Sequence, residues 1–136
     1  MAAAMDFAVV TPEHVKFEGK AEIVVAPGAA GDLGALPNHA PMVTTLRIGV
    51  LRATVEGRSR VEYAVNAGFM QILPDKVVVL TDAALAAADV DVDAVRADLR
   101  RAEEQLAAKR GADDRAERDA VAWARARLEV AHKPAA

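Results

Sequence analysis

The sequence has 136 residues, and 53% of them are hydrophobic, which is enough to bury the core of one domain or of a small domain with an appendage. Its formal net charge of −3 excludes the basic surplus with which nucleic-acid-binding proteins neutralise phosphates. The absence of cysteine excludes a disulfide framework, a thiolate metal site and a cysteine nucleophile.

The first six residues carry neither a basic segment nor a long apolar segment, so we expect no secretory signal. No window of the sequence approaches the roughly 18–20 consecutive apolar residues that span a bilayer. We therefore expect any association with a membrane to occur only through a partner protein.

Residues 7–81 alternate between short apolar runs and turn residues, which is typical of strands and their connections. The predicted strands are residues 7–10, 15–17, 21–26, 42–46, 50–55, 61–65, 69–73 and 77–81. Gly19 is expected to end the second strand, and residues 56 and 57 to separate the fifth from the sixth. Turn signals at intervals of about 8–12 residues favour an antiparallel sandwich or barrel over βαβ units.

Two of these strands differ in their pattern. Val61, Tyr63 and Val65 recur at every second position and should share one face of their strand. Residues 77–80 are all apolar and do not alternate, so we expect that strand to be covered on both sides.

A glycine-rich stretch follows the third predicted strand. Gly28, Gly31 and Gly34 lack the Gly-Lys-Ser/Thr ending of a phosphate-binding loop, and no helix pattern follows them. We therefore predict a tight turn with positive φ at several positions rather than a nucleotide site.

Residues 31–42 are expected to form an irregular loop inside this strand-rich region. Pro37 and Pro41 stiffen it, and the polar residues Asp32, Asn38 and His39 should lie close together. The loop is either a rigid corner between two sheets or a binding surface that a stiff scaffold presents.

Few residues are suited to bond chemistry. His14, His39 and His132 are far apart in the sequence and lack the spacing of metal ligands. Ser59 is the only serine and lies in a predicted hairpin turn, without the flanking residues of a nucleophile. A β-sandwich adaptor that captures a partner helix is the stronger alternative function, and an enzyme with His39 and Asp32 as an acid–base pair is the weaker one.

After residue 88 the period changes to 3.6, so we divide the chain into a β-sandwich domain, residues 1–88, and a helical hairpin, residues 89–136. The first helix should begin at Asp91 or Asp93 and end at residues 109–111, and the second should begin at Asp113 or Asp114. The apolar stripes are Val95, Leu99, Ala102 and Leu106 on the first helix and Val121, Ala124, Leu128 and Ala131 on the second. The short break makes the helices antiparallel neighbours, and the alanine-rich seam predicts a marginally stable hairpin that is able to detach.

Residues 31–42 read Gly-Asp-Leu-Gly-Ala-Leu-Pro-Asn-His-Ala-Pro-Met. They resemble the signature Gly-Glu/Asp-Leu-Gly-x-x-Pro-Gly/Asn-His-Ala-Pro-Leu of the epsilon subunits of F-type ATP synthases. The similarity continues through residues 44–52, upstream through 10–13 and 17–19, and downstream through 67–69, 77–81 and 83–84. The mitochondrial delta subunit is similar too, and the missing transit-like leader favours a bacterial chain.

The resemblance implies a ten-stranded flattened antiparallel β-sandwich followed by an antiparallel two-helix hairpin. It implies a non-catalytic part of the central stalk that turns with the rotor of a proton-translocating ATP synthase and couples c-ring rotation to ATP synthesis through the gamma subunit. The implied partners are gamma, the c-ring and, transiently, the alpha/beta hexamer. The implied location is peripheral, on the cytoplasmic face of the bacterial inner membrane.

The resemblance also implies sites. Asp32, Pro37, Asn38, His39 and Pro41 match the segment that contacts the c-ring and gamma. Some relatives bind ATP on the folded hairpin with a motif like Ile/Leu-Asp-x-x-Arg-Ala, and this chain has Asp93, Arg96 and Ala97 there, with Val92 in the first position. Arg125 and Arg127 would supply further positive charge. The favoured interpretation is a helix cap with surface charge, which leaves ATP as a possible regulatory ligand and no other cofactor or metal.

In many bacterial relatives the hairpin also extends into the hexamer and inhibits ATP hydrolysis. Inhibition would require basic residues that face the acidic part of the beta subunit. Asp113, Asp114, Glu117 and Asp119 dilute the basic residues Arg115 and Arg118, so we expect inhibition to be weak.

Overall fold

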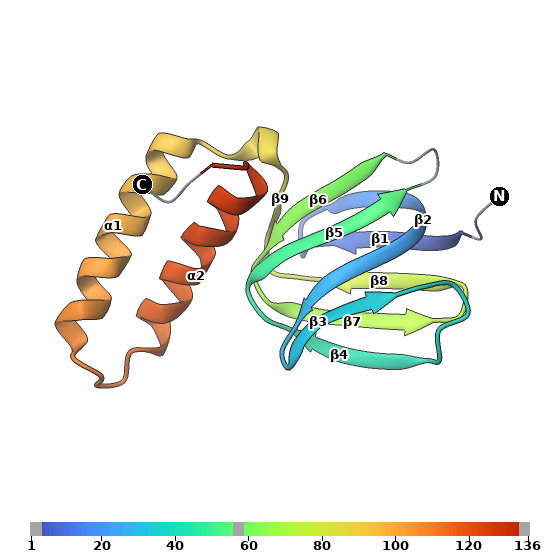
Figure 1. Cartoon of the computed structure of the whole chain (residues 1–136), viewed down its shortest axis with the longest axis horizontal. Helices are drawn as coiled ribbons and strands as arrows, with labels where there is room; N and C mark the ends of the chain where they lie inside the picture. Colours follow the sequence, from blue (N-terminus) through green and yellow to red (C-terminus); the bar gives the residue numbers. More distant parts are fainter. Residues whose placement is uncertain (1–3, 56–58, 134–136) are drawn as a thin grey trace.

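Apolar residues at every second position form a β-sandwich in the first part of the chain, and the period-3.6 pattern forms two helices after it (Figure 1). The computed structural model describes residues 4–55 and 59–133. Its strands are β1 (Met5–Val10), β2 (Val15–Gly28), β3 (Gly31–Ala35), β4 (Met42–Leu46), β5 (Gly49–Val55), β6 (Arg60–Val65), β7 (Gly68–Leu73), β8 (Lys76–Leu80) and β9 (Ala84–Leu85). A 3-10 turn, η1 (Ala87–Asp89), leads into α1 (Val92–Lys109) and α2 (Arg115–Val130).

The strands form two layers that share the long strand β2 (Figure 1). One layer has the order β1-β8-β7-β4 and the other β3-β2-β5-β6-β9, and β2 also pairs with β1 and, at Gly28, with β4. The predicted fold class is confirmed, although the described residues form nine strands where the resemblance implied ten. The antiparallel expectation holds for every pair except β1 and β8, which run parallel.

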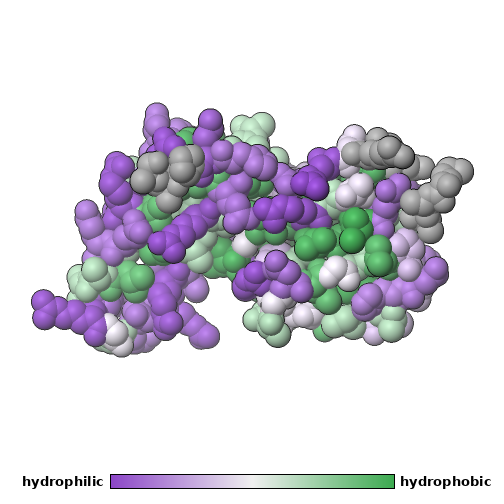
Figure 2. All heavy atoms as spheres, in the orientation of Figure 1, coloured by the Kyte–Doolittle hydropathy of each residue, from purple (hydrophilic) through white to green (hydrophobic). Residues whose placement is uncertain are grey.

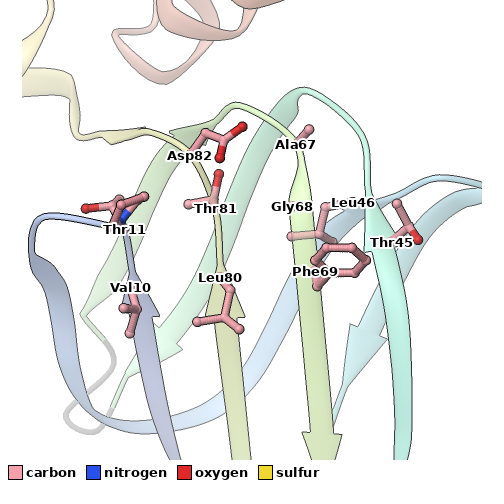
Figure 3. Close-up of a pocket in the computed structure, with 11 residues that line it drawn as sticks. Val10, Thr11, Thr45, Leu46, Ala67, Gly68, Phe69, Leu80, Thr81 and Asp82 are labelled. Carbon is pink, nitrogen blue, oxygen red and sulfur yellow. The ribbon is translucent and has the colours of Figure 1, made fainter.

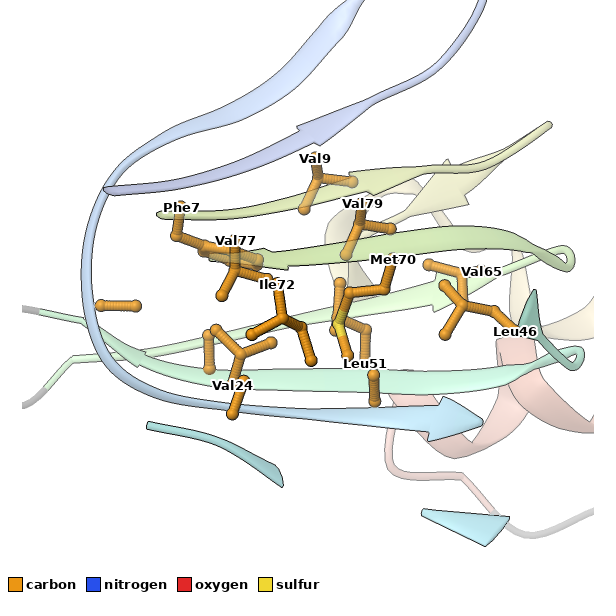
Figure 4. Close-up of a cluster of buried hydrophobic side chains, with 14 of the residues drawn as sticks. Phe7, Val9, Val24, Leu46, Leu51, Val65, Met70, Ile72, Val77 and Val79 are labelled. Carbon is orange, nitrogen blue, oxygen red and sulfur yellow. The ribbon is translucent and has the colours of Figure 1, made fainter. Parts of the chain in front are cut away.

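The core fills the space between the two layers (Figure 4). Its largest fully buried side chains include Phe7, Leu51, Met70 and Ile72. Tyr63 and Val65 pack into this core from β6, as their shared face predicted. The prediction that residues 77–80 are covered on both sides is wrong: Val77 and Val79 are completely buried, but Leu80 points outward and is 49% exposed.

Gly19 does not end a strand, because β2 runs through it without a break. Gly19 lies opposite Phe7 on β1, and a Cβ atom added to it would lie 3.1 Å from the ring of Phe17. That ring contacts the ring of Phe7 with a centroid distance of 5.5 Å. The glycine therefore leaves room for the aromatic pair rather than introducing a turn. The predicted break at residues 56 and 57 lies outside the described residues.

The predicted irregular loop from residue 31 is also wrong in its first part. Residues 31–35 form β3, which pairs with β2 from Gly28↔Gly31 to Val24↔Ala35. Only Gly31 among the three described glycines of this stretch has a positive φ, of 139°, because Gly28 and Gly34 lie within the strands. The irregular segment is therefore limited to residues 36–41, between β3 and β4.

The two helices form the predicted antiparallel hairpin. Asp91, rather than Asp93, caps α1 by accepting a hydrogen bond from the N–H of Ala94, and Arg110 ends it in the left-handed conformation. Asp114 precedes α2. The seam contains the predicted stripes, Val95, Leu99, Ala102, Val121, Ala124 and Leu128, with Leu106 partly buried beside them. Ala131 is not part of it, because α2 ends at Val130.

A second face of α2 packs on the outer side of β5 and β6, which the sequence analysis did not predict. Ala126 and Val130 of the helix contact Val50 and Ala64 of the sheet in a small apolar cluster. The hairpin therefore covers part of the β3-β2-β5-β6-β9 layer. Within residues 4–55 and 59–133, neither helix is long and apolar enough to cross a membrane.

Candidate functional site

The β1-β8-β7-β4 layer has a face that points away from the core, and two rows of side chains cross it. Strand register aligns the first row as Thr45, Phe69, Leu80 and Val10, and the second as Val43, Gln71, Val78 and Ala8. Side chains alternate along each strand, so both rows point away from the buried residues Met70 and Val79. These eight residues are named the open face.

Six of the eight residues of the open face are apolar, and three of these are large and well exposed. Val43, Phe69 and Leu80 are 65%, 55% and 49% exposed, and none of the eight residues is charged. An antiparallel sheet that faces water usually alternates apolar residues inside with polar residues outside. A gathering of large exposed apolar side chains marks a surface that contacts another molecule.

A groove of about 500 Å³ lies at one end of the open face (Figure 3). Val10, Phe69 and Leu80 line it from three neighbouring strands, together with Leu46 and Thr45 of β4. Gly68 begins β7 beside it with a φ of 128°. The lining of the groove is mostly apolar, as a contact with an apolar side chain of a partner would require.

The outer side of the opposite layer has a different character. It carries Arg52 and Glu62, which pair across β5 and β6, and α2 covers its end through Val50 and Ala64. Figure 2 shows mostly hydrophilic residues over the hairpin and hydrophobic residues that reach the surface over the sandwich. The molecule thus covers one outer face with its own hairpin, while within the described residues no element covers the open face.

The predicted contact residues after β3 lie at the end of the sandwich far from the helices (Figure 1). Asn38 has a positive φ of 69°, and its N–H donates to the carbonyl of Pro74 in the β7–β8 turn, at 2.7 Å. The N–H of His39 donates to the carbonyl of Leu36, and its Nδ1 lies 2.7 Å from the carbonyl oxygen of Ala40. Pro37 and Pro41 flank this turn, so the segment is tied to the sheet at its centre.

Asp32 lies at the other end of β3, so the expectation that it lies close to Asn38 and His39 is wrong. Its Oδ1 accepts a hydrogen bond from Arg47 at 2.6 Å, and both residues line a cleft against α2. The separation arises because residues 31–35 are extended rather than folded into a loop. All five predicted contact residues nevertheless lie along one edge of the molecule, formed by β3, β4 and the turn between them (Figure 1).

The hairpin residues matched to an ATP motif are divided between the two helices. Asp93, Arg96 and Ala97 lie in the first two turns of α1. On α2, Arg127 contacts Asp98 at 3.4 Å and stacks over Trp123 at 5.3 Å, while Arg125 contacts Glu103 at 3.2 Å. Carboxylates of α1 therefore already accompany Arg125 and Arg127.

The arrangement offers little for bond chemistry. Asp32 pairs with Arg47 and not with His39, so the acid–base pair of the enzyme alternative is not formed. Across residues 4–55 and 59–133, no group of three or more His, Asp or Glu side chains could hold a metal ion. What the described surface offers instead is contact area.

Sequence reasoning missed the open face although one signal was present. The unbroken apolar run at residues 77–80 indicated that both sides of that strand are covered. In the structure its inner side meets the core and its outer side, with Leu80, is exposed. A strand that is apolar on both sides but covered on one is the pattern expected of a surface that a partner completes.

Residues 4–87 match the family described as ATP synthase, Delta/Epsilon chain, beta-sandwich domain. The chain is 39% identical over 131 residues to an ATP synthase epsilon chain of Desulfitobacterium hafniense, which covers 96% of this chain and 98% of the relative. It is also 43% identical over 105 residues to an ATP synthase epsilon chain of Brevibacillus brevis, which covers 77% and 80% of the two chains.

Solved structures show the same fold. A chain of the Euglena gracilis mitochondrial ATP synthase, in a structure of OSCP, F1 and c-ring, superimposes with a TM-score of 0.71 at 19% identity, over 97% of this chain and 79% of that one. A chain of the Tetrahymena thermophila mitochondrial ATP synthase central stalk and c-ring gives 0.55 at 15% identity, over 88% and 98%. The family match covers the sandwich domain, and the relative from Desulfitobacterium hafniense is 39% identical over almost its whole length. The chain therefore belongs to the ATP synthase delta/epsilon family.

Proposed function

We propose that this chain is the epsilon subunit of a proton-translocating F-type ATP synthase, a non-catalytic part of the central stalk that couples c-ring rotation to ATP synthesis through gamma. The observation that carries the proposal is the open face, an uncharged apolar surface on a protein of this family. Its place would be peripheral, on the cytoplasmic face of a bacterial inner membrane, held there by the complex.

The open face is the proposed contact with gamma. Full burial of a large apolar side chain contributes roughly 1.5–3 kcal/mol, and Val43, Phe69 and Leu80 are each about half exposed or more. Covering these three side chains would therefore contribute on the order of 3 kcal/mol. A rotor part needs such a rigid, well-packed contact because torque passes through it.

Binding to isolated gamma tests this assignment. Phe69→Glu should raise the dissociation constant at least about tenfold, since it buries a charge in an apolar contact. Leu36→Glu is the matched control, because Leu36 is also 55% exposed but lies in the turn after β3. Equal affinities for gamma in the two variants would rule out the open face as the contact.

The edge formed by β3, β4 and their connecting turn is the proposed contact with the c-ring. Pro37 and Pro41 would hold the turn in its bound shape, and Asn38 and His39 would present polar groups to the loops of the c subunits. Asp32, at the other end of the edge, pairs with Arg47 and would meet a basic side chain there. Among the described strands, β3 pairs only with β2.

The double variant Asp32→Arg, His39→Ala should weaken assembly and coupling of proton flow to ATP synthesis. Glu13→Arg, His14→Ala makes the same chemical changes at the β1–β2 turn, away from this edge, and should leave both unchanged. Intact coupling in the first variant would refute the c-ring assignment.

The hairpin, residues 89–136, is proposed as a regulatory segment attached to the sandwich of residues 1–88. It would reach the alpha/beta hexamer only transiently, and its mixture of acidic and basic residues predicts weak inhibition of ATP hydrolysis. Deletion of residues 89–136 should therefore activate hydrolysis only slightly, and large activation would contradict this. ATP as a regulatory ligand stays a prediction that titration calorimetry at millimolar ATP would test.

A further inference from the structure

Four ionisable side chains meet where the end of α2 lies on the sheet. Arg52 of β5 donates from Nε to Glu62 of β6 at 3.1 Å and from Nη2 to Glu129 of α2 at 2.8 Å. Nε2 of His132, just beyond α2, lies 2.9 Å from the second oxygen of Glu62. The sheet thus contributes Arg52 and Glu62, and the hairpin contributes Glu129 and His132.

Glu62 is the centre of this group. Its side chain is only 14% exposed, and its two oxygens face Arg52 and His132 separately. A carboxylate withdrawn from water depends on such charged partners more than an exposed one does. The contact with Glu129, followed by that with Glu62, raises the pKa of Arg52, so its charge is retained at every pH of interest.

The apolar contact beneath these charges is small. The buried residues that join hairpin to sheet are Val50, Ala64, Ala126 and Val130, and two of the four are alanine. Alanine contributes little buried area, so the ion pairs make up a larger share of the docking free energy than they would above a full hydrophobic contact.

We propose that Arg52, Glu62, Glu129 and His132 form an ionic clasp that holds the hairpin on the sheet and that salt loosens. The clasp is a property of the isolated chain and does not depend on the proposed rotor function. Release of the clasp would expose Val50 and Ala64, and the undocked hairpin could then contact another partner.

The effect of salt follows from the charges at this contact. The charged groups on the elements at this end of the hairpin are Glu62 and Arg60 on β6, Arg52 on β5, Glu129 on α2, Asp89 on η1 and the neighbouring Lys133. Arg52 joins carboxylates of the sheet and of the hairpin, so added salt screens this attraction and weakens docking.

Thiol labelling measures the docking equilibrium directly, because the chain contains no cysteine. In the full-length protein, Val50→Cys places one thiol under the hairpin, where it reacts only when the hairpin leaves the sheet. Ala53→Cys places the thiol in the main core instead, where it reacts only when the sandwich unfolds. The comparison separates undocking from global unfolding.

In the Val50→Cys background, the further substitution Glu129→Gln should raise the labelling rate about two- to fivefold at low salt. This is the range expected for the loss of a partly exposed ion pair. His132→Gln should also speed labelling at the same pH, because it removes the imidazole that contacts Glu62. At about 1 M salt the differences should disappear. None of these changes should speed labelling in the Ala53→Cys background.

Arg101→Gln is the matched control, since Arg101 pairs with Asp98 within α1 and does not join hairpin to sheet. It should leave the labelling rate unchanged. Labelling rates in Glu129→Gln and His132→Gln that equal the rate in Arg101→Gln at low salt would overturn the clasp and assign docking to the apolar contact alone.

Discussion

At the scale of single residues, Gly68 is the described glycine that least tolerates a side chain. Its φ of 128° is unfavourable for any other residue, and a Cβ atom would lie 2.0 Å from the carbonyl oxygen of Leu80. We expect Gly68→Ala to lower the free energy of unfolding by about 2–4 kcal/mol, through backbone strain and displacement of β8. Urea denaturation of the two proteins measures the difference.

Gly34→Ala is the control for this prediction. Gly34 has no atom within 4 Å of the position that its Cβ would take, and its φ is not in the left-handed region. The free energy of unfolding should stay within about 0.5 kcal/mol of the parent value. A loss in Gly68→Ala as small as that in Gly34→Ala would mean that β7 and β8 adjust to the side chain without strain.

Some residue-level features could be predicted and others could not. Asp91 as a cap and Leu99 as a seam residue follow from local sequence rules, because the groups that satisfy them lie a few residues away. Ala67 has a positive φ of 60°, although alanine does not favour that region. Its conformation follows from the neighbouring contacts of Asn66 with Ala83 and Gly68 with Leu80, which are distant in sequence.

At the scale of elements, the hairpin should be less stable than the sandwich. Its seam has four large buried side chains among alanines, and it meets the sheet through the small cluster around Val50 and Val130. We expect amide hydrogens of α1 and α2 to exchange through local openings. The free energy of these openings should be lower by about 2 kcal/mol or more than the free energy of the openings that expose the amides of β7. Native-state hydrogen exchange of the isolated protein measures both.

Slow exchange throughout residues 91–131, with the same free energy as the sandwich, would contradict this prediction. It would show that the helices and the sheet unfold as one cooperative unit. The amides of β7 serve as the internal standard, because they lie beside the buried side chains Met70 and Ile72.

The sequence predicted the elements that carry their own pattern and missed those that depend on a neighbour. The helices and seven of the strands have clear apolar periods, and the structure confirms their existence with small shifts in their ends. β3 contains two glycines in five residues and has little strand preference of its own. It is a strand because β2 supplies hydrogen-bond partners along its length, and that pairing moves Asp32 away from His39.

At the scale of the whole molecule, the two outer faces of the sandwich differ in what covers them. The hairpin covers the end of one, through α2, and the other remains apolar and exposed as the open face. The signature at residues 31–42 indicated the family, which the comparisons confirm, because that resemblance depends on residue identities rather than on contacts. Which face would bind a partner could not be predicted, since the sequence does not tell a strand covered by its own chain from one covered by another.

Purification of the intact complex tests the central claim most directly. The full-length chain, carrying an affinity tag, would be isolated from its native membranes in mild detergent, and the proteins bound to it identified and counted. A rotor subunit should retain gamma in a one-to-one ratio, together with the c-ring and the alpha/beta hexamer. Recovery of the tagged chain with an unrelated protein, or without gamma, would contradict the account.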